Sequence, residues 1–207
     1  MCLIVHKPAG IGVSEDLLRA ALSLNRDGWG LMGFAPNGRL LLERHAEIDE
    51  EAVIDTVRRY EPAEFVLHLR QRTRGGVGPH NTHPIRVSTG LYLMHNGTLG
   101  IPSRVAGMSD TWHLVTDVLR PLAQRHRPLF LDNAFHALLE VGLRAENKIA
   151  LLDQPSRRIL LLNRAQGAEL DGLWLSSTRW IDRRLLPLAN APQPQERSFA
   201  ANELHFV

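Results

Sequence analysis

The stretch Met1-Cys2-Leu3-Ile4-Val5-His6 contains the single cysteine of the 207-residue chain and leads directly into an apolar, β-branched run that predicts a strand. If Met1 is removed, Cys2 carries a thiol and a free α-amine on the same residue. A free thiol has a pKa of about 8.5 and an α-amine a pKa of about 7.7 to 8, so the amine can act as a base beside a nucleophile. The alternative is that Cys2 is a small hydrophobic residue of the core.

The composition is that of an ordinary globular chain, with 44% hydrophobic and 22% charged residues. We expect one domain over residues 1–186 and a Pro-containing C-terminal tail over residues 187–207. Neither a membrane-spanning run nor a secretory signal is expected, and one cysteine excludes an internal disulfide, so the sequence favours a cytoplasmic protein. The formal net charge is +2 and the arginines are scattered, so nucleic-acid binding is unsupported.

Hydrophobic periodicity and turn residues predict a mixture of strands and helices. Strands are expected at 1–6, 31–35, 39–43, 64–70, 85–88, 91–94, 148–152, 158–162 and 173–176. Helices are expected after the N-caps Ser14, Asp49, Ser109 and Asp132. Pro121 should bend or end the third helix, and the fourth should turn Phe135, Leu138 and Leu139 inward and stop at Gly142. Strands interrupted by paired helices predict an α+β protein in which two sheets pack on each other with helices outside.

Three short segments could carry chemistry together with Cys2. His68-Leu69-Arg70 ends a predicted strand with a guanidinium that suits a carboxylate, unless Arg70 pairs with a nearby acid. His95-Asn96-Gly97 offers two donors for an oxyanion, although Asn-Gly is also a common turn. Ser109-Asp110-Thr111 places a carboxylate where it could receive an ammonium, although it is also an ordinary helix start.

The ordered set of motifs resembles the class II glutamine amidotransferases, whose glutaminase domain is an N-terminal-nucleophile (Ntn) hydrolase. The resemblance covers about residues 1–180 and rests on the three segments above and on three more: Met1-Cys2, Asp27-Gly28-Trp29-Gly30 and Asn81-Thr82-His83-Pro84. Within this family, the chain is most similar to the small stand-alone members. Two features depart from the family pattern: Leu3 follows the cysteine where many members have glycine, and arginines stand at Arg72 and Arg74.

The resemblance implies a four-layer αββα fold and the release of ammonia from the glutamine side chain through a thioester on Cys2. Asn96 and Gly97 would form the oxyanion hole, and Arg70 and Asp110 would bind the α-carboxylate and α-ammonium of glutamine. Thr73 and His83 would line the pocket. No metal or other cofactor is implied, and a separate synthase partner would accept the ammonia.

Three alternatives remain open at this level. The chain could hydrolyse another γ-glutamyl amide, and Arg72 and Arg74 would then favour an acidic one. It could be a catalytically inactive binding module that has kept the fold. It could also hold a metal ion through His68, His80, His83 and His95, although their spacing matches no zinc signature.

Overall fold

The computed structural model describes residues 2–187, and the proposed tail, from residue 188 onward, lies outside them. Ten strands form two antiparallel sheets within the described residues. The six-stranded sheet has the order β3 (Leu40–His45), β2 (Trp29–Phe34), β4 (Glu64–Leu69), β1 (Leu3–Lys7), β10 (Leu173–Leu175) and β9 (Ala168–Leu170). The four-stranded sheet has the order β5 (Ile85–Ser88), β6 (Leu91–Asn96), β7 (Lys148–Asp153) and β8 (Arg158–Leu162).

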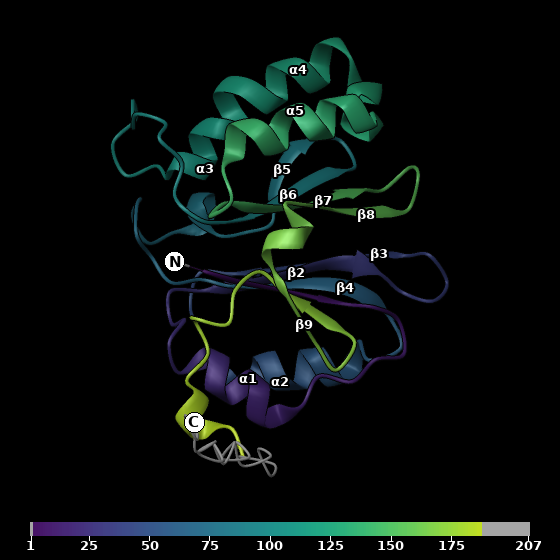
Figure 1. Cartoon of the computed structure of the whole chain (residues 1–207), viewed down its shortest axis with the longest axis vertical. Coiled ribbons are helices and arrows are strands. Elements are labelled where there is room, and N and C mark those ends of the chain that lie inside the picture. Colours follow the sequence, from purple (N-terminus) through teal and green to yellow (C-terminus); the bar gives the residue numbers. More distant parts are fainter. Residues whose placement is uncertain (1, 188–207) are drawn as a thin grey trace, which may run out of the picture.

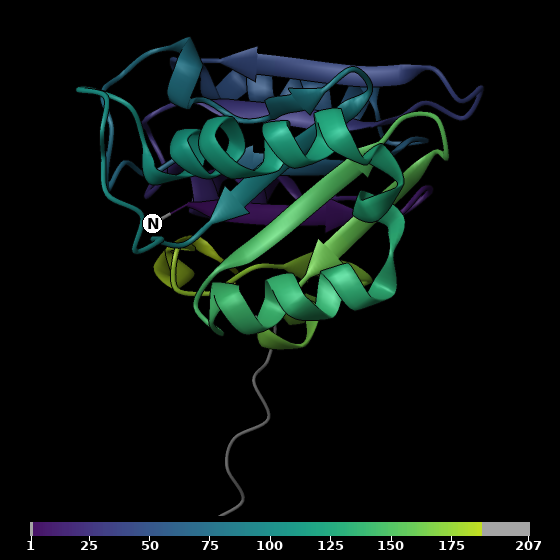
Figure 2. The same ribbon diagram turned by 90° about the horizontal axis from the view of Figure 1, so that it is seen from above.

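The helices lie on the outer faces of the two sheets, as Figures 1 and 2 show. Helices α1 (Glu15–Leu22) and α2 (Glu50–Arg59) cover the six-stranded sheet, and the other helices cover the four-stranded sheet. The second group comprises α3 (Asp110–His113), a π-helical segment (Leu114–Leu119), α4 (Arg120–Arg125) and α5 (Asn133–Leu143). The predicted α+β arrangement, with paired sheets inside and helices outside, is therefore confirmed.

Strand β1 shows how the alternation of side chains builds the layers. Leu3 and Val5 point to the face covered by α1 and α2 and belong to the hydrophobic cluster there. Ile4 points to the opposite face and packs with Met94 and Ala150 of the four-stranded sheet. All five residues of β1 are buried, because a strand with a helix layer on one side and a sheet on the other has no solvent-facing side.

The helix caps confirm the local reading of the sequence. Ser14, Asp49, Ser109 and Asp132 each accept a hydrogen bond from a backbone N–H in the first turn of the helix that follows. The helix that begins after Ser109 does not end at Pro121, although an end there is one of the two effects predicted for this residue. It continues through α4, and the π-helical segment just before Pro121 supplies a different hydrogen-bond pattern, with the Arg120 N–H donating to the Val115 carbonyl.

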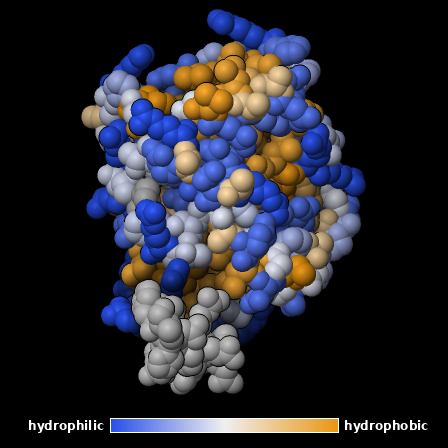
Figure 3. Space-filling view, in the orientation of Figure 1, coloured by the Kyte–Doolittle hydropathy of each residue, from blue (hydrophilic) through white to orange (hydrophobic). Residues whose placement is uncertain are grey.

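Two expectations for α5 were wrong. The helix passes Gly142 and ends at Leu143, with Arg144 in the cap position at a φ of 62°. Leu138 is 68% exposed, whereas Phe135 and Leu139 pack on the core as expected. Figure 3 shows hydrophobic surface near the top of the molecule, where α4 and α5 lie. Strand β9 was missed, because a three-residue strand carries too little periodicity to recognise.

No helix within residues 2–187 combines the length and the apolarity that crossing a membrane requires.

Candidate functional site

Cys2 lies immediately before β1, which is an inner strand of the six-stranded sheet. Leu3 pairs with Leu69 of the antiparallel neighbour β4, so Arg70, just after β4, comes beside Cys2. Strand β6 of the other sheet contacts β1 and ends at Asn96. These segments meet at the end of the sandwich where the N label stands in Figure 1.

A small cavity opens at this meeting point, and residues from separate segments line it. Cys2, Arg70, Gly97 and Asp110 are all part of its wall. The other lining residues are Gln71, Arg72, Thr73, Arg74, Asn81, His83, His95, Ser109 and Thr111. Six of the seven predicted site residues therefore surround one cavity, and Asn96 is the exception.

The Cys2 thiol is partly buried, and its Sγ lies 3.6 Å from the Gln71 carbonyl oxygen. Burial raises the pKa of this thiol. The hydrogen bond to Gln71 and the positive charge of Arg70 act in the opposite direction, while the negative charge of Asp110 raises the pKa further. The thiol therefore needs a base in order to act as a nucleophile near neutral pH.

Arg70 presents a buried guanidinium that donates to backbone carbonyls. Its Nη1 lies 3.4 Å from the Asp27 oxygen and its Nη2 lies 3.1 Å from the Gly76 oxygen. No carboxylate of the described chain forms an ion pair with it, and burial lowers its pKa. A buried cation that lacks an anion is suited to bind a carboxylate from outside.

Asp110 begins α3 and is buried. Its Oδ2 accepts from the Leu99 N–H at 2.6 Å and its Oδ1 accepts from the Thr111 N–H at 2.9 Å. Each oxygen of an ionised carboxylate can accept more than one hydrogen bond, so the group keeps acceptor capacity toward the cavity. Asp110 can hold an ammonium at a fixed position because two backbone groups orient it.

Gly97 and Asn96 have different surroundings. Gly97 has a φ of 145°, and a Cβ there would lie 2.2 Å from Asn147 Oδ1, so the position requires glycine. The Asn96 side chain is turned away from the Cys2 cavity, and its Nδ2 donates to Ser176 Oγ at 2.8 Å. Ser176 in turn accepts from the Ile4 N–H at 2.9 Å, which ties Asn96 to the strand that carries Cys2.

His83 is buried at the cavity wall, and neither ring nitrogen has a hydrogen-bond partner in the described chain. Its ring packs on His68 with 4.2 Å between the ring centroids. Burial lowers the pKa of His83 well below its usual value and that of His68 to about 3, so both rings are neutral at physiological pH. Thr73 is exposed at the edge of the cavity.

His95 is oriented by two side chains. Its Nε2 lies 3.0 Å from Asn147 Oδ1, and its Nδ1 lies 2.8 Å from the Thr111 hydroxyl. The Asn147 oxygen can only accept, so Nε2 carries the proton and Thr111 donates to Nδ1. Within residues 2–187, no three His, Cys, Asp or Glu side chains are grouped to hold a metal ion, and His80 is exposed.

Asn81 organises the cavity wall, a role that no local sequence pattern predicted. Its Nδ2 donates to the Gly76 and Gly107 carbonyls at 3.0 and 2.8 Å, and its Oδ1 accepts from the Ser109 N–H at 2.8 Å. It therefore joins the loop after β4 to the loop before α3. Asn81 belongs to the motif Asn81-Thr82-His83-Pro84, which marked this segment as important. The motif could not indicate the role of Asn81, because Gly107 and Ser109, to which it bonds, are distant in sequence.

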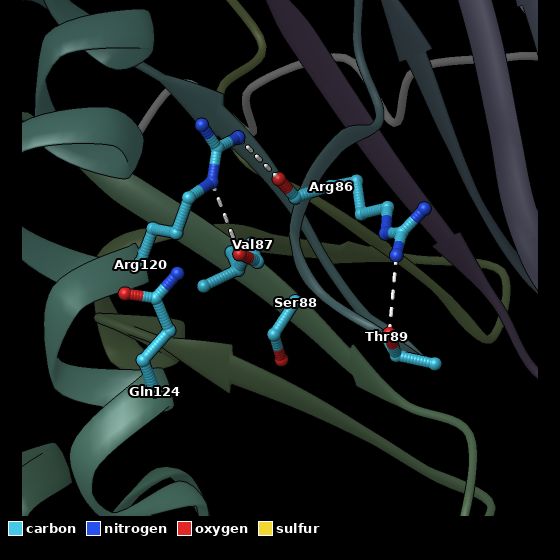
Figure 4. Close-up of a pocket in the computed structure, with 6 residues that line it drawn as sticks. All are labelled: Arg86, Val87, Ser88, Thr89, Arg120 and Gln124. Carbon is cyan, nitrogen blue, oxygen red and sulfur yellow. Dashed lines mark hydrogen bonds between the residues drawn. The ribbon is translucent and has the colours of Figure 1, made fainter.

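A larger cavity between β5 and α4, shown in Figure 4, lacks the features of a catalytic site. Arg120 turns its guanidinium to the Arg86 and Val87 carbonyls, while the Arg86 side chain points the other way, to the Thr89 hydroxyl. The two guanidinium groups do not converge, and no cysteine or histidine lines the cavity.

The stacked antiparallel sheets between helical layers, with a cysteine at the start of an inner strand, define the Ntn-hydrolase class of fold. The chain belongs to the class-II glutamine amidotransferases, and the model of that family matches residues 2–148. No curated protein matches the sequence.

Two solved structures illustrate what the fold is similar to. Glutamine phosphoribosylpyrophosphate amidotransferase from B. subtilis is 11% identical with a TM-score of 0.45, and the match covers 84% of this chain and 41% of that one. A glutamine aminotransferase class-II domain protein from Silicibacter pomeroyi is 14% identical with a TM-score of 0.34, and the match covers 74% and 73%. The chain thus spans less than half the length of the first of these.

Proposed function

We propose that this chain hydrolyses the side-chain amide of glutamine and releases ammonia. The observation that carries the proposal is the convergence of Cys2, Arg70, Gly97 and Asp110, from four separate segments, on one cavity. Together they supply a nucleophile, a site for a carboxylate, a backbone donor and a site for an ammonium. Family membership supports the same chemistry, and the family match begins at Cys2.

In the proposed mechanism, removal of Met1 exposes the α-amine of Cys2, which takes the thiol proton. Arg70 binds the α-carboxylate of glutamine and Asp110 binds its α-ammonium. The thiolate attacks the amide carbon, and the Gly97 N–H stabilises the oxyanion. Asn96 serves as the second donor if its amide turns from Ser176 toward the cavity. The C–N bond breaks as the amine returns its proton to the leaving ammonia, and water then hydrolyses the thioester to give glutamate.

Thr73 and His83 complete the pocket wall in this proposal, and a separate synthase partner receives the ammonia. A reducing compartment such as the cytoplasm suits a nucleophile that must remain a free thiol.

The test is ammonia release from glutamine by the purified full chain, with intact mass showing whether Met1 has been removed. Cys2→Ala should lower turnover at least about 1,000-fold, because the nucleophile is lost. Arg70→Met should lower kcat/KM about 10- to 100-fold, because a charge-assisted hydrogen bond to the carboxylate is lost. Arg120→Gln, which alters the cavity of Figure 4, is the matched control. Full activity of Cys2→Ala would disprove the proposed nucleophile.

A γ-glutamyl amide with an acidic amine is a second candidate substrate, because Arg72 and Arg74 line the same cavity. Arg74 Nη1 donates to the Leu99 carbonyl at 3.2 Å, and the Arg72 side chain is exposed. Replacing either arginine by alanine should then lower kcat/KM for γ-glutamyl-glutamate and leave that for glutamine unchanged. Equal effects on both substrates would favour glutamine itself.

A catalytically inactive module would release neither ammonia from glutamine nor free glutamate from γ-glutamyl-glutamate, even with Met1 removed.

A further inference from the structure

A second cavity, of about 440 Å³, is lined in part by Asn96 and is not lined by Cys2. Strands of both sheets contribute to it: Asn96 and Lys148 come from the four-stranded sheet and Ala168 from β9 of the six-stranded sheet. Ser176 and Trp180 come from the chain after β10. Its volume falls in the range of small-molecule sites. We call it the Lys148 cavity.

Lys148 is the central group of this cavity. It pairs with Asn96 across β6 and β7, so the two side chains lie on the same face of the sheet. Lys148 is buried, and its ammonium has no hydrogen bond or ion pair within the described part of the chain. Burial is the main cause of its lowered pKa and the positive charge of Arg179 adds to it, while the carboxylate of Glu146 acts in the opposite direction. A bound anion would offset the effects of burial and of the Arg179 charge on the Lys148 ammonium.

Other polar groups of the cavity are also unsatisfied. The Nε1 of Trp180 and the Oδ1 of Asn96 are buried, and neither has a partner in the described residues. Arg179 lines the cavity and is exposed, and its guanidinium binds no other residue of the described chain. Glu146 is the one acidic residue in the lining. Two cations against one carboxylate leave the cavity with a net positive charge.

The Lys148 cavity differs from the cavity of Figure 4 in whether its polar groups have partners within the protein. There both guanidinium groups donate to oxygens of the protein itself, so neither needs a ligand. In the Lys148 cavity the indole N–H of Trp180 and the amide oxygen of Asn96 are buried without partners, and neither cation has a hydrogen bond or ion pair from its side chain in the described residues. Buried polar groups are normally hydrogen-bonded, so two unpaired ones beside a cavity of this size, together with two cations that lack a bonded partner, favour a polar ligand.

We propose that the Lys148 cavity binds a small oxyanion, a carboxylate or a phosphate, that also carries a hydroxyl or amino group. The anionic group lies between Lys148 and Arg179. Trp180 Nε1 and Asn96 Oδ1 are inaccessible to solvent in this structure, so small rotations of these side chains let the first donate to the anion and the second accept from the hydroxyl or amino group. The ligand would contact the residue that precedes Gly97, so it lies next to the Cys2 cavity without entering it.

Calorimetric titration of the full chain at constant ionic strength tests the proposal. Malate and glycerol 3-phosphate are matched probes, because each carries a hydroxyl group and one presents carboxylates while the other presents a phosphate. We expect saturable binding of at least one probe, with a Kd of about 1 mM or tighter. Preference between the probes identifies the anionic group. Failure of both probes to bind would overturn the proposal.

Variants locate the bound anion. Lys148→Met keeps the apolar stem but removes the charge, and it should weaken binding about tenfold. Arg179→Gln also removes a positive charge and should weaken binding as well. Glu146→Gln removes the one carboxylate and should tighten binding about two- to fivefold. Arg120→Gln, in the cavity of Figure 4, should leave binding unchanged. The Arg179 and Glu146 variants decide the question if Lys148→Met fails to fold.

Arg70→Met separates this site from the Cys2 cavity. Binding that persists in Arg70→Met and weakens in Lys148→Met supports the proposal, and the reverse pattern would place the anion beside Cys2 and overturn it. The readout does not involve amide hydrolysis, so the outcome is independent of the proposed function.

Discussion

Cys2 lies between two charges that act on its thiol in opposite directions. The Arg70 guanidinium stabilises a thiolate and the Asp110 carboxylate destabilises it, while burial raises the pKa of the thiol more than either charge changes it. The same two residues are proposed to bind the charged ends of the substrate. A bound amino acid would neutralise both at once, so substrate binding changes the electrostatic environment of the nucleophile.

This arrangement predicts opposite effects of two substitutions on the reactivity of Cys2. Arg70→Met should raise the pKa of the thiol, and Asp110→Asn should lower it. The measurement is the rate of alkylation by iodoacetamide as a function of pH, which reports Cys2 alone because the chain has one cysteine. Arg120→Gln should leave the profile unchanged. Shifts of the same sign in both variants would contradict the geometry.

At the scale of elements, the site depends on two loops that Asn81 holds together. Its amide bonds to both loops, and the Gly76 N–H also donates to the Gly107 carbonyl at 2.7 Å. The loop after β4 carries Arg70 and Thr73 at the cavity, and the loop before α3 leads to Asp110. Asn81 is therefore a positioning residue for both ends of the proposed substrate site.

Asn81→Ala should remove three hydrogen bonds and loosen both loops, with a loss of about 1 to 3 kcal/mol in stability. We expect KM for glutamine to rise more than kcat falls, because Arg70 and Asp110 lose their relative placement while Cys2 keeps its strand. Faster proteolytic cleavage within residues 71–84 is a second readout. Asn37→Ala, in an exposed turn, is the control. Unchanged KM and cleavage would show that the loops hold their positions without Asn81.

At the scale of the whole molecule, three buried histidines link stability to pH. Burial lowers the pKa of His68, His83 and His95 below the value of a free histidine. Below about pH 6.5 the unfolded chain therefore binds protons at these positions that the folded chain does not. The free energy of unfolding falls as the pH falls, and for His68 this continues down to about pH 3.

For His68, whose pKa in the folded protein is about 3, we expect the free energy of unfolding to fall by about 1.4 kcal/mol per pH unit between about pH 6 and pH 4, and His83 and His95 to add losses in the same direction. Urea denaturation at pH 7, 6, 5 and 4 measures this change in the free energy of unfolding. His68→Gln should reduce the slope by about one such increment, whatever its effect at pH 7, because one proton-binding group is removed. His80→Gln, in which an exposed ring is replaced, should leave the slope unchanged. A stability that does not vary with pH over this range would contradict the buried, neutral state of the rings.

Local sequence signals determined the individual elements. The four N-caps, the hairpin strands and the inner strand after Cys2 follow from short-range chemistry, because a cap or an alternating strand is specified by residues within a few positions. The motif order also predicted the family, and six of the seven residues proposed for the site line the cavity. The inward position of Leu138 and the stop at Gly142 were wrong because the neighbours of α5, rather than its own periodicity, decide which residues are covered.

Only the tertiary structure decided which of these groups meet. The register of β1 with β4 brings Arg70 to Cys2, and the packing of the second sheet brings Gly97 there while it turns the Asn96 side chain to Ser176. Asn81 and the Lys148 cavity likewise depend on contacts between residues far apart in the chain. Sequence fixes what each segment can form, but convergence depends on the pairing of strands and sheets, which no local pattern encodes.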